Sequence, residues 1–199
     1  DPADYESVDM PTLGAKNGVK LYDMIGLDYN DPKWDELLDQ MTFDEMNSLI
    51  GDAFHWTMPV KSVEAPGTRD ENGPQGLTAS LLSSDKSQLT ATAFTSEDVM
   101  AATFNTEIMT EIGKVIGNNC LEADIACLYA YEVKAIQDKG VHVVMKHFAL
   151  NDCEQDRIGL GVWLNEQAAR EVYLKAFQAP VEVGNANGVM IAYTRWGAV

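Results

Sequence analysis

Beyond residue 120, short apolar runs alternate with longer amphipathic stretches. The runs ADIACLYA, VHVVMKHF and GVMIAY each have the length and composition of a buried strand. The stretches between them, YEVKAIQDKG and EQAAREVYLKAFQAPVEVG, predict helices; Gly140 ends the first and Asn165 is the N-cap of the second. Pro180 is expected to kink the second helix or to end it early. Strands that alternate with helices predict a parallel α/β fold.

Helix signals also mark the first half of the chain from Lys33 onward. Thr42 and Glu45 form a capping box for a helix that continues through Ile50. Ser96 and Asn105 are N-cap residues of two further helices. The predicted apolar faces are Trp34, Leu37, Leu38 and Met41 in the first helix, and Ile108, Ile112, Val115 and Ile116 in the helix that follows Asn105.

Three stretches depart from this pattern. Residues 1–32 are acidic and turn-rich, which predicts a linker or an extended arm before a domain. Residues 58–77, MPVKSVEAPGTRDENGPQGL, predict a loop whose GPQG core could shape a binding rim. The run ADIACLYA continues into the next helix with no Gly, Pro, Asn or Ser, although loops in α/β units usually span ~2–6 residues. Either the chain is naturally short between Ala130 and Tyr131, or residues are absent there.

Charge and cysteine content narrow the function classes. The 199 residues carry a formal net charge of -17, which argues against binding to nucleic acid or to an anionic membrane. No apolar run approaches the roughly 18 residues that a membrane span needs. The three cysteines are odd in number and lack zinc-ligand spacing, so we expect three free thiols, no metal site and no cofactor. The compartment stays open.

The segment KHFALNDCEQDR, residues 146–157, places many polar side chains directly after an apolar strand. The carboxyl end of a parallel strand is where an α/β barrel places ligand-binding groups. Lys146 and His147 supply donors, and Arg157 adds a planar fork suited to vicinal hydroxyls or a carboxylate. Alternatively, His147 is a packing residue and Arg157 pairs with a nearby acidic side chain, Asp152, Glu154 or Asp156.

A second candidate is GVMIAYTRWG, another strand that ends in Tyr193, Arg195 and Trp196. An aromatic platform beside hydrogen-bond donors suits a sugar ring, which has apolar CH faces and a rim of hydroxyls. The alternative is that the aromatic residues belong to an ordinary core and that Met190 fills a gap in it.

These segments resemble glycoside hydrolase family 3, the family of many β-glucosidases. The resemblance lies in KHFALND with EQDR after it, WLNEQAAREVYLKAF and VMIAYTRWGA. GPQGL is similar to the family's DGPxG loop, and AATFNTEIMTEIGKVIG to its AATWNxE helix. The resemblance extends from Trp34 to Ala198. It implies a partial (β/α)8 barrel of the TIM type over residues 33–199, with residues 1–32 as a connector to other domains.

The resemblance also implies which residues contact a sugar. They are Asn72, Lys146, His147, Arg157, Met190 and Tyr193. Lys146 and His147 would bind hydroxyls, Arg157 would contact or support the sugar, and Met190 and Tyr193 would line the pocket. Asn72 stands where the family has an Asp, so a neutral hydrogen bond, roughly half as strong, replaces a charge-assisted one.

No catalytic residue can be assigned from the resemblance. The family is retaining, which requires a carboxylate nucleophile and a carboxylic acid/base about 5–5.5 Å apart. Its nucleophile belongs to an SDW-like motif on the strand after VMxxY, and Val199 precedes that motif. The family's GRNFEYxSED segment, which carries a sugar-binding Arg, would fall at the abrupt junction after ADIACLYA and is missing.

We therefore expect a glycosidase of the β-glucosidase type in the parent protein, acting on terminal β-D-glucosidic bonds of a β-glucoside or oligosaccharide by a retaining mechanism. The 199 residues alone are expected to show little or no hydrolysis. One alternative is a non-catalytic carbohydrate-binding remnant. Another is a structural fragment that forms a homo-oligomer, or that missing domains complete, because an exposed sheet edge favours association.

Overall fold

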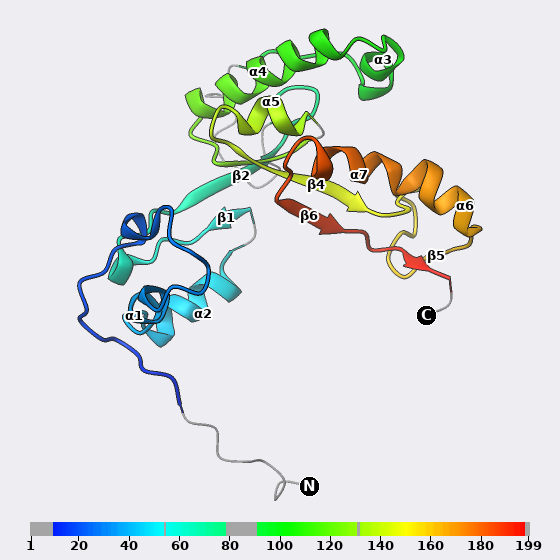
Figure 1. The fold of residues 1–199 in the computed structure, drawn as a ribbon. Coiled ribbons are helices and arrows are strands. Elements are labelled where there is room, and N and C mark those ends of the chain that lie inside the picture. Colours follow the sequence, from blue (N-terminus) through cyan, green and yellow to red (C-terminus); the bar gives the residue numbers. More distant parts are fainter. Residues whose placement is uncertain (1–9, 54, 79–90, 131, 198–199) are drawn as a thin grey trace, which may run out of the picture. The chain divides into compact units, whose positions relative to one another are not determined.

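A computed structural model describes residues 10–53, 55–78, 91–130 and 132–197 (Figure 1). The chain divides into two compact units, Asp1–Thr68 and Arg69–Val199. The predicted boundary between an arm and a domain at residue 32 stays a prediction. The junction between Ala130 and Tyr131 lies outside the described residues because Tyr131 is not among them.

The first unit is built from short helices around a small apolar cluster. Its elements are η2 (Leu21–Met24), α1 (Lys33–Leu38), α2 (Phe43–Gly51), β1 (Trp56–Thr57) and η3 (Lys61–Val63). The predicted capping box is confirmed, because the Thr42 side chain accepts from Glu45 N and Glu45 accepts from the Thr42 backbone. The predicted apolar face of α1 needs one correction, since Leu38 is exposed while Leu37 and Met41 are buried.

The second unit contains a parallel sheet with helices against it. Its elements are β2 (Thr68–Asn72), α3 (Glu97–Ala102), α4 (Thr106–Glu122), β3 (Cys127–Tyr129), α5 (Val133–Gln137), β4 (His142–Phe148), β5 (Gly161–Val162), α6 (Glu166–Ala168), the π-helical turn η4 (Ala169–Tyr173), α7 (Lys175–Glu182), β6 (Gly188–Ile191) and β7 (Arg195–Trp196). Strands β2, β3, β4 and β6 are neighbours in that order and all pair in parallel. Strands β5 and β7 form a separate parallel pair.

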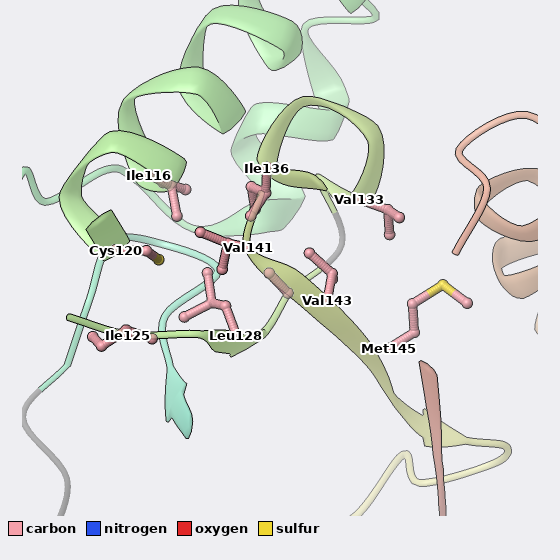
Figure 2. Close-up of a cluster of buried hydrophobic side chains, with 10 residues drawn as sticks. Ile116, Cys120, Ile125, Leu128, Val133, Ile136, Val141, Val143 and Met145 are labelled. Carbon is pink, nitrogen blue, oxygen red and sulfur yellow. The ribbon is translucent and has the colours of Figure 1, made fainter. Parts of the chain in front are cut away.

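The core of this unit lies between the sheet and helices α4 and α5 (Figure 2). It contains Ile116 and Cys120 of α4, Leu128 of β3, Ile136 of α5, and Val143 and Met145 of β4. Because side chains alternate along a strand, Val143 and Met145 face the helices, whereas Val144 and Lys146 face the opposite side of the sheet. The sheet therefore separates an apolar helix-covered face from a second face that carries polar groups.

Two local predictions were wrong, and a third was right only in the position of the residue. Residues 58–77 are not all loop, because TRDEN forms strand β2 within them. The buried stripe of α4 consists of Gly113, Ile116, Gly117 and Cys120, while Ile108 and Val115 are exposed. Ser96 occupies the N-cap position of α3 without a side-chain capping hydrogen bond.

Other local predictions agree with the structure. The side chain of Asn105 accepts from two backbone N–H groups at the start of α4, and Asn165 accepts from Ala168 N. Pro180 lies inside α7, which ends two residues later at Glu182. The three cysteines are free thiols. The predicted α/β class and the partial barrel of parallel strands with flanking helices are confirmed.

Candidate functional site

Asn72, the last residue of β2, is held in place by the GPQG turn that follows it. Thr78 donates to the Asn72 carbonyl oxygen through both its N–H, at 3.1 Å, and its hydroxyl, at 3.0 Å. The turn closes with a hydrogen bond of 3.2 Å from Gly76 N to the Gly73 carbonyl oxygen. A Cβ at Gly73 would come within 2.7 Å of the Gly76 carbonyl oxygen, so this turn requires glycine there. The GPQG sequence thus fixes Asn72 at the carboxyl end of its strand.

Lys146 joins the carboxyl ends of three strands. Its Nζ donates to Asn72 Oδ1 at 2.6 Å and lies 4.7 Å from the centroid of the Tyr129 ring. The strand register aligns Asn72 with Tyr129, so their side chains share one face of the sheet. A cation over an aromatic face is stabilised by the ring quadrupole. Strands β2, β3 and β4 therefore deliver an amide, a phenol ring and an ammonium group to one place.

Burial and neighbouring charge lower the pKa of both basic residues at the end of β4. The pKa of Lys146 is lowered first by desolvation and then by Arg157, with an opposing effect from Glu154. The pKa of His147 is lowered first by desolvation and then by Lys146 and Arg157. Lowering from the ordinary value of 6.5 makes His147 a neutral imidazole at neutral pH. The site thus offers a neutral donor and acceptor beside two cations.

Arg157 lies in the loop after β4 and has two partners. One guanidinium nitrogen pairs with Glu154 Oε2 at 2.6 Å, which confirms the alternative that Arg157 pairs with a nearby acidic residue. The same guanidinium lies 5.0 Å from the centroid of the Tyr193 ring. A guanidinium has five N–H donors, so pairing with Glu154 leaves others able to bind a further acceptor. Ion pairing and ligand contact are therefore compatible for this residue.

The remaining predicted residues lie on and after the next strand. Met190 is half-buried within β6, which pairs with β4. Tyr193 follows β6, is half-exposed, and is brought to the site by its contact with Arg157. The pairing of β4 with β6 shifts register between Met145 and Phe148, the stretch that contains Lys146 and His147. Such irregularities re-aim side chains and are common next to active sites.

Tyr129 is a site residue that the sequence analysis missed. Its ring lies against the Lys146 ammonium, and its pKa is raised by burial first and then by Asp70, Cys127 and Glu71. The sequence could have indicated Tyr129 by its position, because it stands at the end of the predicted apolar strand that precedes β4 in the chain. Equivalent carboxyl ends of neighbouring parallel strands meet at one edge of a sheet.

The cluster can bind a polyhydroxylated ligand, and it offers no evident metal site. Lys146 contacts the Asn72 amide and the Tyr129 ring, and His147 and Arg157 lie close enough to Lys146 for their charges to interact. Across the described ranges, no three His, Cys, Asp or Glu side chains are grouped to hold a metal ion. None of the helices within those ranges is long and apolar enough to cross a membrane.

The depressed pKa of His147 predicts a pH dependence of stability. The unfolded chain takes up a proton at His147 near pH 6.5 while the folded chain resists it, so the free energy of unfolding should fall as the pH drops below that value. Urea unfolding between about pH 8 and about pH 5 measures this fall. His147→Gln should flatten the curve, and an equally steep curve in that variant would contradict the assignment.

Comparisons with known proteins agree with this geometry, although no protein-family model matches the sequence. An exo-α-(1→6)-L-arabinopyranosidase of Bifidobacterium breve is 28% identical over 196 residues, covering 80% of this chain and 26% of that protein. The structure of β-glucosidase 3B from Thermotoga neapolitana in complex with glucose matches 82% of this chain and 30% of its own, with 27% identity and a TM-score of 0.69. A glycoside hydrolase family 3 β-glucosidase of Bifidobacterium adolescentis, at 23% identity and a TM-score of 0.67, supports the fold; the match covers 78% of this chain and 27% of that one.

The chain spans about a quarter of the length of the curated relatives it matches. Relatives and structural neighbours alike are glycosidases, and they cover most of the present chain. The resemblance predicted from the motifs is confirmed: over most of its length the chain is similar to β-glucosidases of the glycoside hydrolase family 3 type, and it has the fold of part of their barrel.

Proposed function

We propose that this chain supplies the sugar-binding end of a barrel in a retaining β-glucosidase, which hydrolyses terminal β-D-glucosidic bonds. Its substrate would be a small β-glucoside or an oligosaccharide. The relatives support this assignment, since they include β-glucosidases and an arabinopyranosidase. A structural neighbour of 27% identity was solved with glucose.

The observation that carries the proposal is the hydrogen bond between Lys146 Nζ and Asn72 Oδ1 at 2.6 Å. The bond joins two side chains that are 74 residues apart in the sequence. It pre-organises a cation and an amide at the carboxyl ends of β2 and β4, where α/β barrels bind their ligands. While Oδ1 of Asn72 accepts from Lys146, its amide nitrogen can still donate to a sugar hydroxyl.

The other predicted residues have complementary roles in this proposal. His147, kept neutral, can both donate to one hydroxyl and accept from another. Arg157 supplies further donors while Glu154 and Tyr193 hold its guanidinium in place. Met190 and Tyr193 line the pocket and offer apolar contact to the CH face of the ring.

The proposal assigns binding, and no catalytic carboxylate, to the described residues. A retaining mechanism needs two carboxyl groups about 5–5.5 Å apart on either side of the bond that breaks. Glu154, an acidic residue beside the site, pairs with Arg157, and its Oε1 accepts a hydrogen bond from Asn151 Nδ2 at 2.7 Å. We therefore propose that these residues bind sugar without hydrolysing it.

Calorimetric titration of the chain with glucose and with glucono-1,5-lactone tests this function. We expect saturable binding of both ligands, with no hydrolysis of an aryl β-glucoside in a parallel assay. A folded chain that binds neither ligand would overturn the proposal.

Asn72→Asp should strengthen glucose binding. The change replaces a neutral hydrogen bond with a charge-assisted one, which is worth about 1 kcal/mol more and corresponds to an affinity about 5-fold higher. Calorimetry on both chains measures the difference. Asn187→Asp is the matched control, because it adds the same charge next to the amino end of β6 and should leave affinity unchanged. Weaker binding by Asn72→Asp would contradict the role given to Asn72.

A further inference from the structure

The paired strands β5 and β7 form a short ribbon, in which Gly161 aligns with Arg195 and Val162 with Trp196. Gly159 N donates to the Tyr193 carbonyl oxygen at 3.1 Å, where the ring of Tyr193 already contacts Arg157. Further along, Gly197 N donates to the Val162 carbonyl oxygen at 2.9 Å. From Tyr193 to Gly197 the backbone can extend up to about 13 Å, at ~3.3 Å per residue. The ribbon thus leads away from the site over the length of a short oligosaccharide.

Trp163 follows β5 and lies across this ribbon. A Cβ built on Gly197 would meet Cζ3 and Cη2 of the indole at 3.8 and 3.9 Å, and one built on Gly161 would meet its Nε1 at 3.6 Å. These atoms are at opposite ends of the indole, so the ring spans the two glycines. The indole therefore lies over both glycines, at a spacing that would place a methyl group on either one in ordinary van der Waals contact with the ring.

The outer face of Trp163 remains open. The residue is 75% exposed although its ring lies close to Gly161 and Gly197. A large aromatic surface that is both oriented and exposed is suited to stacking against a flat apolar ring face.

We propose that Trp163 binds the group on the leaving side of the glucosidic bond. Glucose would occupy the Lys146 cluster, and the next sugar or an aryl group would stack on the indole. This inference rests on the proposed function, since it gives the same site a second binding position. The expected ligand has a flat apolar ring face. Both the CH face of a sugar and an aryl ring provide such a face.

Calorimetry with three probes tests the inference on the full chain. Glucose reports on the Lys146 cluster alone, cellobiose adds a second sugar, and phenyl β-D-glucoside adds an aryl ring. Trp163→Ala should weaken binding of cellobiose, phenyl β-D-glucoside or both by about 3- to 10-fold and leave glucose binding unchanged. Trp163→Phe should retain most of the affinity because it keeps an aromatic face.

The outcomes separate this inference from the proposed function. Suppose that the wild type binds glucose, and that Trp163→Ala binds cellobiose and phenyl β-D-glucoside as tightly as the wild type does. That result overturns the binding role of Trp163 and leaves the proposed function standing. Equal weakening of all three probes by Trp163→Ala also overturns it, because a general structural role would have that effect. Failure of the wild type to bind any probe overturns both. The probe whose affinity falls identifies a sugar or an aryl group as the ligand.

Discussion

Lys146→Ala is expected to weaken glucose binding by about 10-fold or more. A hydrogen bond from a charged group contributes about 1.5–3 kcal/mol, and every 1.4 kcal/mol is tenfold in affinity. The substitution also removes the donor to Asn72 Oδ1 and the cation over the Tyr129 ring, so it disturbs two neighbouring ligand contacts. Calorimetric titration at neutral pH measures the change.

Lys134→Ala is the matched control for this prediction. The Lys134 ammonium pairs with Asp138 on the surface of α5, so its loss removes the same charge away from the candidate site. Affinity for glucose should stay within a factor of about two of the wild type, as expected for a screened surface charge. If Lys146→Ala binds glucose as tightly as Lys134→Ala, the cluster at the end of β4 is not the glucose site.

Ile116→Ala is expected to reduce the free energy of unfolding by about 2–5 kcal/mol. Ile116 is fully buried in the cluster between α4, α5 and the sheet (Figure 2), and shortening it leaves a cavity among side chains that cannot fully collapse. Alanine favours a helix at least as well as isoleucine, so the loss reports on packing alone. Urea unfolding monitored by circular dichroism gives the value.

Ile108→Ala provides the comparison on the same helix. Ile108 is 47% exposed, and exposed substitutions usually change stability by no more than about 0.5 kcal/mol. A similar loss in both variants would mean that the buried stripe of α4 has been assigned to the wrong face.

The sequence was sufficient to predict the strands whose apolar residues form the core. Strands β3, β4 and β6 lie within the apolar runs from which they were predicted. Strand β2 was missed because TRDEN is polar throughout. In the structure Glu71 is 1% exposed, and Arg69 donates to its Oε1 at 3.0 and 2.7 Å. This ion pair between residues two apart places an opposite charge beside the buried Glu71 carboxylate, and hydrophobic periodicity does not detect it.

The face of α4 was misassigned for a different physical reason. The helix packs closely on α5 through Gly113 and Gly117, where an added Cβ would come within 2.6 Å of Ala135 Cβ and 2.9 Å of Lys139 Cγ. An apolar-stripe analysis looks for large side chains and gives no weight to glycine. Close packing of two helices at small residues therefore rotated the buried face away from Ile108 and Val115.

The sequence was sufficient to predict most residues of the candidate site, but not the contacts between them. Polar residues at a strand end identified Lys146, His147 and Arg157, and the family motifs added Asn72, Met190 and Tyr193. The contact between Lys146 and Asn72 depends on which strands are neighbours, which no local pattern contains. Tyr129 enters the site for the same reason, through the alignment of β2 with β3.

Chemical-shift mapping with glucose tests the location of the binding site most directly. The isotope-labelled chain is titrated with glucose and its amide signals are assigned. We expect saturable shifts concentrated at Asn72, Tyr129, Lys146, His147 and Arg157, and their loss in Lys146→Ala. Shifts confined to other residues, or none at saturating glucose in a folded chain, would contradict a sugar site at the carboxyl ends of β2, β3 and β4.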